Sequence, residues 1–418
     1  MENHRNWAGN YRYLAAELLE PESVEQVQEQ VGRGSRIKVL GTRHSFNGIA
    51  DTEGSHLSLS KLNRVVALDP ESRSVTVEGG IRYGELGRYL HERGYALHNL
   101  ASLPHISVAG AIATATHGSG DRHGNLATAV RALELVAADG ERVALSRGDE
   151  DFDGAVVHLG ALGVVTQVTL DVVPAFEVSQ YVYEQLPLAN LQDAFDAISS
   201  CTYSVSLFTD WRSSEINQVW LKRSHADPES PDRAAVDFYG ASPATANRHP
   251  VPGHAADPCS EQMGVPGPAY ERLPHFRMDF TPSAGDELQS EYFVPRGEAY
   301  AALRAIDRLK ERIAPILHIS EVRTIAADGL WMSPCYRQDS VGIHFTWKAD
   351  GEAVGRVLPI LERELAPYGA RPHWAKLFAM PPERVQPLYE RLPAFRQLRS
   401  RLDPQGKFRN EWLDAYIG

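Results

Sequence analysis

Cysteine is scarce in this sequence, with three residues, Cys201, Cys259 and Cys335, in a chain of 418. They stand far apart, and this spacing matches neither a disulfide framework nor a Cys-x-x-Cys metal site. The sixteen histidines are scattered without a His-Glu-x-x-His motif, so we predict no zinc or other metal site. Such cysteine usage is typical of a reducing cytoplasm, and we expect that location here.

Long apolar runs are absent as well. No stretch approaches the roughly 18 apolar residues of a membrane-spanning helix. Residues 1–13 are polar and lack the apolar core of a signal peptide. The formal net charge of −12 disfavours nucleic acid and anionic membranes as main partners. We expect a monomer whose partner is a small molecule.

The length of the chain exceeds what a single hydrophobic core usually supports, so two domains are expected. The composition changes near Pro174, and we place the domain boundary there. Residues 1–174 then form the first domain, which residues 373–418 complete. Residues 175–372 form the second domain.

Apolar spacing and turn signals predict the elements of both domains. In the first domain they indicate helices at residues 21–31 and 83–93, short strands at 36–40, 56–59, 64–68 and 74–78, a hairpin over 132–146, and a buried strand ending near 173–174. In the second, helical stretches at 188–198 and 297–313 alternate with strands. The fold class is therefore α+β, with helices on one face of the second sheet.

The strand at residues 36–40 runs into a polar turn at residues 41–45 (Gly-Thr-Arg-His-Ser). Such a turn presents backbone N–H groups to an anion, and His44 stands where the backbone would curl around the ligand. Two readings remain open from this stretch alone. It is either a surface turn with a solvated histidine, or a diphosphate-binding turn whose histidine meets, or is covalently joined to, a flavin.

Small residues fill the stretch from Ser107 to Gly120. They allow the backbone to approach a flat or charged ligand closely, whereas an ordinary core needs larger side chains to fill its volume. A flexible glycine-rich loop is the alternative, but the branched Val108 and Ile112 and the threonines oppose it. We therefore predict a ligand in the missing volume.

Three predicted strands of the second domain carry polar side chains at every second position, which places those side chains on one face. The polar positions are Gln289, Glu291, Glu321, Arg323, His344 and Thr346, and the opposite positions are Leu288, Tyr292, Val322, Ile343, Phe345 and Trp347. An antiparallel sheet with one face in water shows the same alternation. The mixture of carboxylate, amide, guanidinium, imidazole and hydroxyl groups instead suits a polyhydroxylated ligand.

Nine prolines lie between residues 223 and 274, where apolar runs are few. This proline-rich segment is either disordered or a lid or wall beside the pocket. We favour an ordered wall, with Tyr239, Met263, Tyr270 and Phe276 as its anchors.

The turn and the small-residue stretch belong to a series of motifs that is known as a set. Residues 41–45 (GTRHS), 104–110 (PHISVAG) and 116–120 (THGSG) resemble the FAD-binding domain of the vanillyl-alcohol-oxidase flavoprotein family. Residues 371–376 (RPHWAK) and 403–410 (DPQGKFRN) resemble its sugar-oxidising branch. Residues 102–105 and 288–292 are most similar to the alditol oxidases of that branch. The resemblance spans essentially the whole chain.

This resemblance implies a two-domain FAD-dependent oxidase. The first domain would bind FAD with two α+β subdomains, and the second would be a substrate-binding cap built on an antiparallel sheet. The implied reaction oxidises the terminal hydroxyl of alditols such as xylitol and sorbitol to the aldose and reduces O2 to hydrogen peroxide. The resemblance also implies that His44 carries the flavin covalently on its 8α-methyl carbon. Many relatives have glycine before this histidine, where Arg43 stands here, and an arginine can face the pyrophosphate.

The resemblance further assigns roles to single residues. Lys376, which by pattern alone is a snorkelling surface lysine, would lie between the flavin ring and the reactive end of the substrate. We expect catalysis by Lys376, Arg323, His344 and Glu321, with His344 as the proton acceptor. The expected substrate contacts are Ser102, Gln289, Glu321, Arg323, Thr346 and Lys376. The expected FAD-binding residues are Gly41, Thr42, Arg43, His44, Ser45, Ser102, Ser107, Gly110, Thr114, Thr116, His117, Gly118, Val165 and Lys376.

Two other functions compete with this one. An aldonolactone oxidase or dehydrogenase would use the same scaffold, and turnover of a lactone against an open polyol separates the two. A non-catalytic flavin-binding protein is the second alternative. Reduction of the flavin by substrate without oxygen would exclude it.

Overall fold

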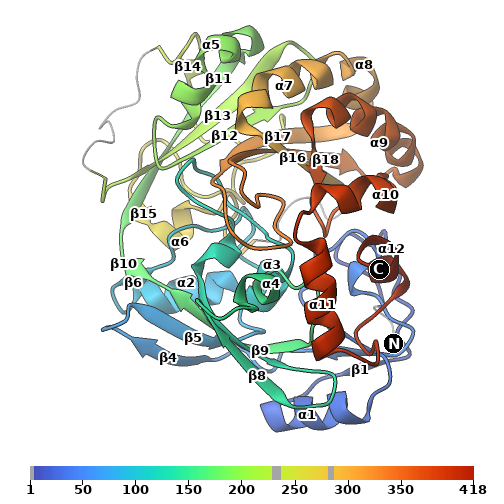
Figure 1. The fold of residues 1–418 in the computed structure, drawn as a ribbon. Helices are drawn as coiled ribbons and strands as arrows, with labels where there is room; N and C mark the ends of the chain where they lie inside the picture. The colour runs from blue at the N-terminus through green and yellow to red at the C-terminus, as the bar shows by residue number, and fades with distance from the viewer. Residues whose placement is uncertain (1–3, 228–236, 281–286) are drawn as a thin grey trace.

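The computed structural model describes residues 4–227, 237–280 and 287–418. Within them the strands form a three-stranded parallel sheet, a five-stranded antiparallel sheet and a nine-stranded antiparallel sheet, besides one two-stranded pair. Figure 1 shows the two smaller sheets in the lower half of the molecule and the large sheet in the upper half. The α+β class predicted from the sequence is confirmed, and so is the antiparallel cap sheet.

The three-stranded sheet leads the chain into the polar turn. Its order is β1 (Glu17–Leu19), β3 (Ser55–Ser58) and β2 (Ile37–Leu40), and helix α1 (Val24–Arg33) packs on it through Val27 and Val31. The helix begins three residues later than predicted because the Ser23 side chain accepts a hydrogen bond from Gln26 N and acts as the N-cap.

The five-stranded sheet confirms the hairpin and two of the predicted short strands, and the other two are β2 and β3 of the three-stranded sheet. The order of the five-stranded sheet is β4 (Val65–Asp69), β5 (Ser74–Glu78), β9 (Val164–Asp171), β7 (Val130–Val136) and β8 (Arg142–Ser146). The accompanying elements are α2 (Tyr83–His91), β6 (Tyr95–Ala96), α3 (Val108–Ala113), α4 (Phe152–Val156) and β10 (Val173–Pro174). The stretch of small residues thus contains a short ordered helix, and the alternative of a flexible loop is wrong for it.

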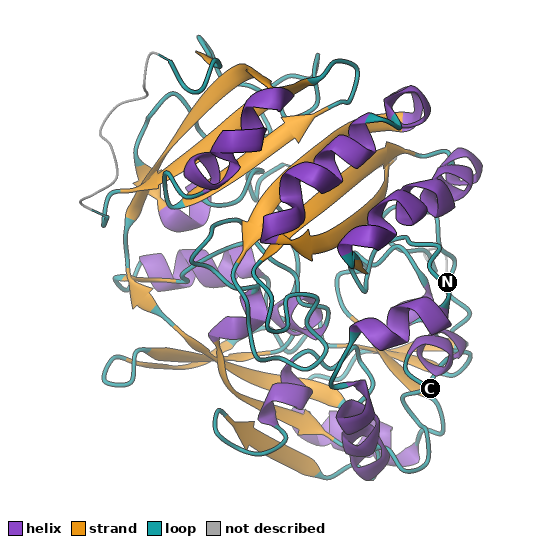
Figure 2. Cartoon of the chain, turned by 45° about the horizontal axis from the view of Figure 1, so that its top comes forward, coloured by secondary structure: helices purple, strands orange, loops and turns teal. Residues whose placement is uncertain are grey.

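The large sheet carries helices on one face. Its order is β14 (Ser242–Pro243), β11 (Glu177–Pro187), β13 (Glu215–Ser224), β12 (Ser204–Thr209), β17 (Leu317–Ile325), β18 (Ser340–Lys348), β16 (Glu287–Pro295) and β19 (Arg371–Pro372), and β15 (Gly267–Pro268) pairs with β11. Helices α5 (Leu191–Ser199), α7 (Ala299–Asp307) and α9 (Gly351–Leu365) cover its outer face, as Figures 1 and 2 show.

The predicted helices of the large sheet differ from the observed ones at their ends. The stretch predicted at 188–198 starts with a 3-10 turn before α5. The stretch predicted at 297–313 is divided between a 3-10 turn, α7 and the short α8 (Lys310–Ile313). Helical spacing alone does not distinguish one helix from two that share a buried face.

Two hydrophobic cores follow from these sheets. One lies around the five-stranded sheet and includes the buried Leu133, Val168 and Leu413. The other lies between the large sheet and its helices, where Tyr292, Phe345 and Trp347 are buried. The domain boundaries near residues 174 and 372 remain predictions, and the separation of the two cores is consistent with them.

The C-terminal segment returns to the lower half of the molecule (Figure 1). It contains α10 (Pro382–Val385), α11 (Leu392–Leu402) and α12 (Glu411–Tyr416). The Asp403 carboxylate accepts hydrogen bonds from Lys407 N and Phe408 N at 2.7 and 2.8 Å, which shapes the DPQGKFRN turn. The carbonyl of Lys407 accepts from Ile37 N at 2.9 Å, so this turn fixes the strand that precedes His44.

The described part of the proline-rich segment is ordered, as predicted, and it includes the short helix α6 (Ala269–Arg272). Two of the four predicted anchors are correct, since Phe276 and Tyr270 pack against hydrophobic clusters. The other two are wrong, because Tyr239 and Met263 are 42% and 46% exposed. Residues 228–236, also within the prediction, lie outside the described residues. None of the helices described is both long and apolar enough to cross a membrane.

Candidate functional site

A cavity of about 970 Å³ lies between the two halves of the molecule. This volume is at the upper end of the range for ligand pockets. Its lining includes the polar turn, the small-residue stretch and the polar face of the large sheet, three features that the sequence analysis identified separately. The cavity therefore joins the predicted cofactor site to the predicted substrate site.

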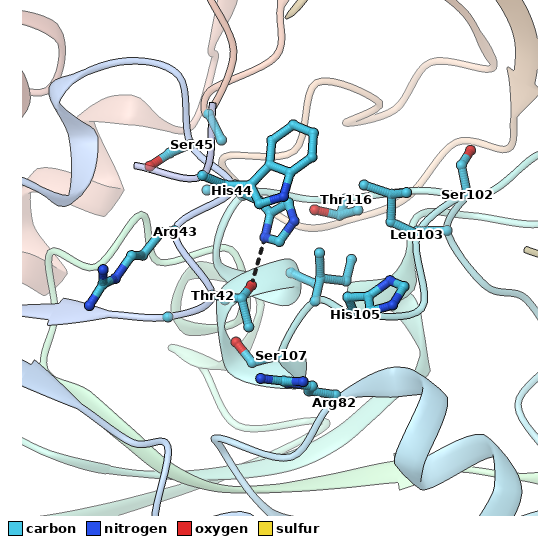
Figure 3. Close-up of a pocket in the computed structure, with 18 of the residues that line it drawn as sticks. Thr42, Arg43, His44, Ser45, Arg82, Ser102, Leu103, His105, Ser107 and Thr116 are labelled. Carbon is cyan, nitrogen blue, oxygen red and sulfur yellow. Dashed lines mark hydrogen bonds between the residues drawn. The ribbon is translucent and has the colours of Figure 1, made fainter. Parts of the chain in front are cut away.

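His44 lies at the tip of the polar turn. Its Nδ1 is 3.1 Å from the Thr42 hydroxyl, and its ring stacks on the indole of Trp7 with centroids 5.2 Å apart (Figure 3). Its Nε2 is buried and has no hydrogen-bond partner among the described residues. Burial lowers the pKa of His44 to about 4, so at neutral pH the ring is uncharged and its unpaired nitrogen has a lone pair or a proton to offer a ligand.

Arg43 takes the conformation in which glycine is common. Its φ is 65°, in the left-handed region that costs a residue with a Cβ atom roughly 1–2 kcal/mol. Figure 3 shows its guanidinium pointing away from the ring of His44. The expectation that this arginine faces a pyrophosphate therefore lacks support from its orientation, although the residue does line the cavity.

The small residues form a closely packed wall around Ser107. A Cβ atom added to Gly110 would lie 2.9 Å from the Ser107 hydroxyl, and one added to Gly41 would lie 3.2 Å from it. Small side chains at these positions bring the turn and the start of α3 together and leave the cavity open beside them. Ser107, Thr116, Thr42 and His44 all line this cavity, and Figure 3 shows their side chains.

The predicted FAD-binding residues line the cavity with one exception. Gly118 does not, because it packs tightly elsewhere: an added Cβ would collide with the backbone oxygen of Leu100. Its carbonyl instead lies 2.8 Å from Nδ1 of His117 and fixes that ring.

The polar face of the large sheet is turned into the cavity, and the alternative of a sheet face in water is wrong. Strand register places Glu291 opposite His344, and His344 opposite Glu321, in one row across β16, β18 and β17. Gln289 and Thr346 are paired in the next row. The six predicted polar residues all line the cavity, while the six predicted apolar ones are buried in the core beneath the helices.

Glu291 is the centre of the charged groups on this face. Its side chain is 0% exposed and accepts hydrogen bonds from Arg323 at 2.9 Å and from Lys376 at 2.6 Å. His117 Nε2 lies 3.1 Å from Glu291 Oε1, the oxygen that also accepts from Arg323. Burial acts to raise the pKa of Glu291, but Lys376, His117 and Arg323 outweigh it and hold that pKa well below its usual range. The carboxylate is therefore ionised and is the shared counter-charge of two buried cations.

Lys376 and His344 form a pair beside this carboxylate. Lys376 Nζ lies 2.8 Å from His344 Nδ1, and His344 Nε2 lies 3.0 Å from the Thr346 hydroxyl. Burial and the neighbouring ammonium hold the pKa of His344 well below its usual value. Burial also lowers the pKa of Lys376, against the opposing effect of Glu291. A neutral imidazole thus accepts from the lysine through Nδ1 and donates to Thr346 through Nε2.

Arg323 connects the sheet to the small-residue side of the cavity. Its guanidinium donates to the Ser102 hydroxyl at 3.3 Å and to the His117 carbonyl at 3.4 Å. Arg323 also pairs with Glu321, at 3.5 Å, a longer contact than the one with Glu291. The nearer partner of Glu321 is His275, at 2.7 Å.

Three residues that matter here have no role that the sequence predicts. Glu291 stands on the predicted polar face, but alternation does not show which member of a face is central. His275 directly follows the proline-rich segment, which has no periodicity to place it, and Trp7 lies in an N-terminal stretch without a pattern. His117 and His373 are both buried near Glu291.

Main-chain hydrogen bonds of residues 373–377, which include Lys376, connect the two sides of the site. Asn47, three residues after His44, donates to the carbonyls of Trp374 and Lys376 at 2.8 and 2.9 Å. Leu377 N donates to the Gln289 carbonyl at 2.8 Å, and His373 N to the Glu291 carbonyl at 2.9 Å. The segment is therefore held against both the polar turn and the sheet.

Two protein families match parts of the chain. Residues 15–146 match the family described as FAD binding domain, and residues 285–416 match the family described as D-arabinono-1,4-lactone oxidase. An alditol oxidase of Streptomyces sp. is 50% identical over 411 residues, which cover 98% of this chain and 97% of that protein. An L-gulono-1,4-lactone dehydrogenase of Mycobacterium tuberculosis is 29% identical, over 99% of this chain and 98% of the other.

Solved structures show the same fold at low sequence identity. A cholesterol oxidase from B. sterolicum superposes with a TM-score of 0.79 at 13% identity, covering 99% of this chain and 96% of that one. A xylooligosaccharide oxidase from Myceliophthora thermophila, in complex with xylobiose, gives a TM-score of 0.74 at 15% identity, covering 98% and 93%. Both share the arrangement of sheets that encloses the cavity.

The first prediction concerns Glu291. Glu291→Gln removes the counter-charge of Lys376 and leaves Arg323 with its longer contact to Glu321, which costs about 3–5 kcal/mol in the free energy of unfolding. Glu184→Gln is the matched control, because Glu184 pairs with Arg248 where both are partly exposed and such a pair contributes less than about 1 kcal/mol. Urea unfolding followed by tryptophan fluorescence measures both.

The pH dependence of this loss checks its cause. A carboxylate whose pKa is depressed by folding stabilises the protein fully above its unfolded pKa of about 4.3, and the contribution is lost as the pH falls through the folded value. The difference between wild type and Glu291→Gln should be constant from about pH 8 to pH 5.5 and shrink below about pH 4.3. Equal losses for Glu291→Gln and Glu184→Gln would contradict the central position of Glu291.

Proposed function

We propose that this chain, which belongs to the family of FAD-linked alditol and aldonolactone oxidoreductases, is an oxidase of open-chain polyols. The protein is an FAD-dependent oxidoreductase. In the proposed reaction the terminal hydroxyl of an alditol such as xylitol or sorbitol becomes the aldehyde of the aldose. O2 takes up the two electrons and two protons and becomes hydrogen peroxide.

One observation carries the proposal. Side chains of five hydrogen-bonding types converge on the cavity from one sheet face, and the relative that is 50% identical over nearly the whole length is an alditol oxidase. A buried polar group left unpaired costs about 1–3 kcal/mol. A face with this many hydrogen-bonding groups therefore suits a ligand that brings several hydroxyls. The lactone oxidoreductases are more distant relatives, so that alternative has less support.

The cavity fits FAD on the side of the polar turn. The wall of small residues around Ser107 leaves room for a flat ligand, and His44 offers an unpaired, buried ring nitrogen. We propose that the turn, Ser107, Gly110, Thr114, Thr116 and Val165 hold the cofactor. We also propose that His44 is joined to its 8α carbon, an attachment in which an N–C bond replaces a C–H bond and the two electrons pass to oxygen. When bound, the flavin accepts the hydride of the substrate's terminal C–H bond.

The chain's own residues supply the charge and the proton acceptor. Lys376 and Arg323 place positive charge beside the reacting oxygen in a site from which water is largely excluded, where such stabilisation is strongest. His344 is neutral, and its Nδ1 already accepts from Lys376. We propose that the substrate hydroxyl enters between these two groups, so that its proton passes to Nδ1 while the lysine stabilises the oxygen. Glu321, Gln289, Thr346 and Ser102 would hold the other hydroxyls.

Several expectations remain proposals of the same kind. We propose that residues 1–174 and 373–418 form the FAD-binding domain and residues 175–372 the cap. We also propose that the protein works as a monomer in the cytoplasm.

The second prediction is a covalent flavin on His44. Denatured wild-type protein should stay yellow after acid precipitation and fluoresce on a denaturing gel. His44→Ala should release free FAD into the supernatant, whereas His225→Ala, outside the cavity, should not. Free flavin in the wild-type supernatant would show that the attachment is absent.

The third prediction concerns Lys376. Lys376→Met keeps the side-chain length and removes the charge, so the rate of flavin reduction by xylitol in stopped flow should fall by at least about a hundredfold, the scale of one lost electrostatic stabiliser. Flavin content should be unchanged. Lys348→Met, on the exposed end of β18, is the control and should reduce normally. Normal reduction in Lys376→Met would place the lysine outside the chemistry.

The fourth prediction is the order of substrates. A site built to bind hydroxyls rejects an analogue that lacks them far more strongly than one that is shorter by a carbon. Five- and six-carbon alditols should have the highest kcat/KM, glycerol a lower one, and 1-propanol a value lower by about a thousandfold or more. Peroxide release with each substrate measures this order. A larger kcat/KM for an aldonolactone than for xylitol would move the chain to the lactone-oxidising branch.

A further inference from the structure

A chain of buried hydrogen bonds runs from Lys222, on strand β13 of the large sheet, to Glu321. Lys222 Nζ on β13 lies 3.0 Å from Nδ1 of His275, and His275 Nε2 lies 2.7 Å from Glu321 Oε1. The exposed fractions of the three residues are 1%, 5% and 5%. Of the three, Lys222 does not line the cavity, so it can affect a ligand only through its neighbours.

Lys222 and Glu321 fix the direction of the bonds in this chain from its two ends. The acceptors of Lys222 are the carbonyls of Leu273 and Pro274 and Nδ1 of His275, and they match the three N–H donors of its ammonium form; burial lowers the pKa of Lys222 to about 7. Burial acts to raise the pKa of Glu321, but Arg323 and His275 outweigh it and hold that pKa well below its usual range, so the carboxylate only accepts. The single proton of a neutral His275 therefore lies on Nε2 and is donated to Glu321, which leaves Nδ1 to accept from Lys222.

The imidazole has little freedom to leave this position. Phe208 and Trp220 hold its ring edge-on, with centroids 5.5 and 5.1 Å away. Its backbone N–H donates to the Ser102 carbonyl at 3.1 Å. Burial and the nearby Lys222 lower the pKa of His275 to about 4, so the ring is neutral at physiological pH. The proline-rich segment thus brings one histidine to a fixed place beside the substrate face.

The hydrogen bond from His275 orients the Glu321 carboxylate. The contacts of this carboxylate with His275 and with Arg323 both use Oε1. Among the described residues no hydrogen bond to Oε2 is found, although Glu321 lines the cavity. With Oε1 held, Oε2 is directed to accept a hydrogen bond from a ligand hydroxyl.

We propose that Lys222 and His275 are positioning residues that determine how strongly Glu321 binds one hydroxyl of the substrate. The inference rests on the proposed function for the identity of that substrate as a polyol. The inference also gives the proline-rich segment a role. The end of this segment places His275, which directly follows it, and Lys222 on the sheet binds the backbone carbonyls of Leu273 and Pro274. The pair should influence the affinity for polyols more than the rate of the chemical step, because Lys376, His344 and Arg323 hold the reacting end.

A double-mutant cycle tests the proposal. His275→Leu removes the donor, His275→Gln keeps an N–H near the position of Nε2, and Lys222→Met removes the donor to Nδ1 together with the contacts to the carbonyls of Leu273 and Pro274. Each is measured in the wild type and in Glu321→Gln. We expect His275→Leu and Lys222→Met to raise KM for xylitol about tenfold, the equivalent of one lost hydrogen bond, with kcat changed less than about twofold. His275→Gln should recover most of the loss.

The Glu321→Gln background distinguishes positioning from general damage. If the two residues act through Glu321, His275→Leu should add nothing to the effect of Glu321→Gln. An equal rise in KM in both backgrounds, or no rise in either, would overturn the proposal. Flavin content and thermal midpoint identify a variant that fails to fold, and in that case His275→Gln and Lys222→Met decide the matter by the same criteria.

A second measurement does not depend on the substrate. In protein labelled with 15N-histidine, the signals of His275 are those that disappear in His275→Gln. We expect a protonated Nε2 and an unprotonated Nδ1, and a shifted Nδ1 signal in Lys222→Met, which removes the donor to that nitrogen. The opposite tautomer or an imidazolium in the wild type would overturn the proposal. Glu321→Gln without effect on any polyol would contradict the proposed function instead, and the tautomer would still decide whether the two residues position Glu321.

Discussion

The ionised carboxylate of Glu291 is the interaction on which the rest of the site depends. Two cations, Arg323 and Lys376, would not remain buried beside one another without a counter-charge, because isolated buried charges are expensive. Their contacts with Glu291, at 2.9 and 2.6 Å, come from three different elements of the fold. The carboxylate therefore sets where positive charge is available in the cavity.

The large sheet makes this arrangement possible because one of its faces is apolar and the other is polar. One face packs against helices through Phe345 and Trp347, which frees the other to carry polar groups toward the lower half of the molecule. Gly342 permits the closest approach, since a Cβ there would lie 3.3 Å from His117 and 3.4 Å from Glu291. The C-terminal segment then closes the cavity by bringing Lys376 to Glu291, while Asn47 ties the same segment to the turn that carries His44. Cofactor side and substrate side are thus fixed by the same short stretch of chain.

The sequence predicts the polar sheet face well because a strand's side chains alternate strictly, so Glu321, Arg323, His344 and Thr346 could be placed without coordinates. It does not predict which member of the face is central, because the partners of Glu291 come from segments far away in the chain. His275 lies in an irregular segment, and Lys222 sits on a strand where a lysine reads as exposed. The left-handed φ of Arg43 is also hidden, since it departs from the preference for glycine at such positions. Local sequence patterns therefore predict the helices, the strands and the faces of the strands. The hydrogen-bond network of the site depends on contacts between segments that are far apart in the sequence.

In the proposed function, the charges organised by Glu291 serve the oxidation of a polyol by bound flavin. An anaerobic titration of the purified yellow protein with xylitol and with sorbitol tests this role, because it observes the reductive step without any assumption about the electron acceptor. We predict that the absorbance of oxidised flavin disappears in proportion to the added polyol and returns, with hydrogen peroxide, when air is admitted. Flavin that stays oxidised with both polyols, whether or not an aldonolactone reduces it, would contradict this function.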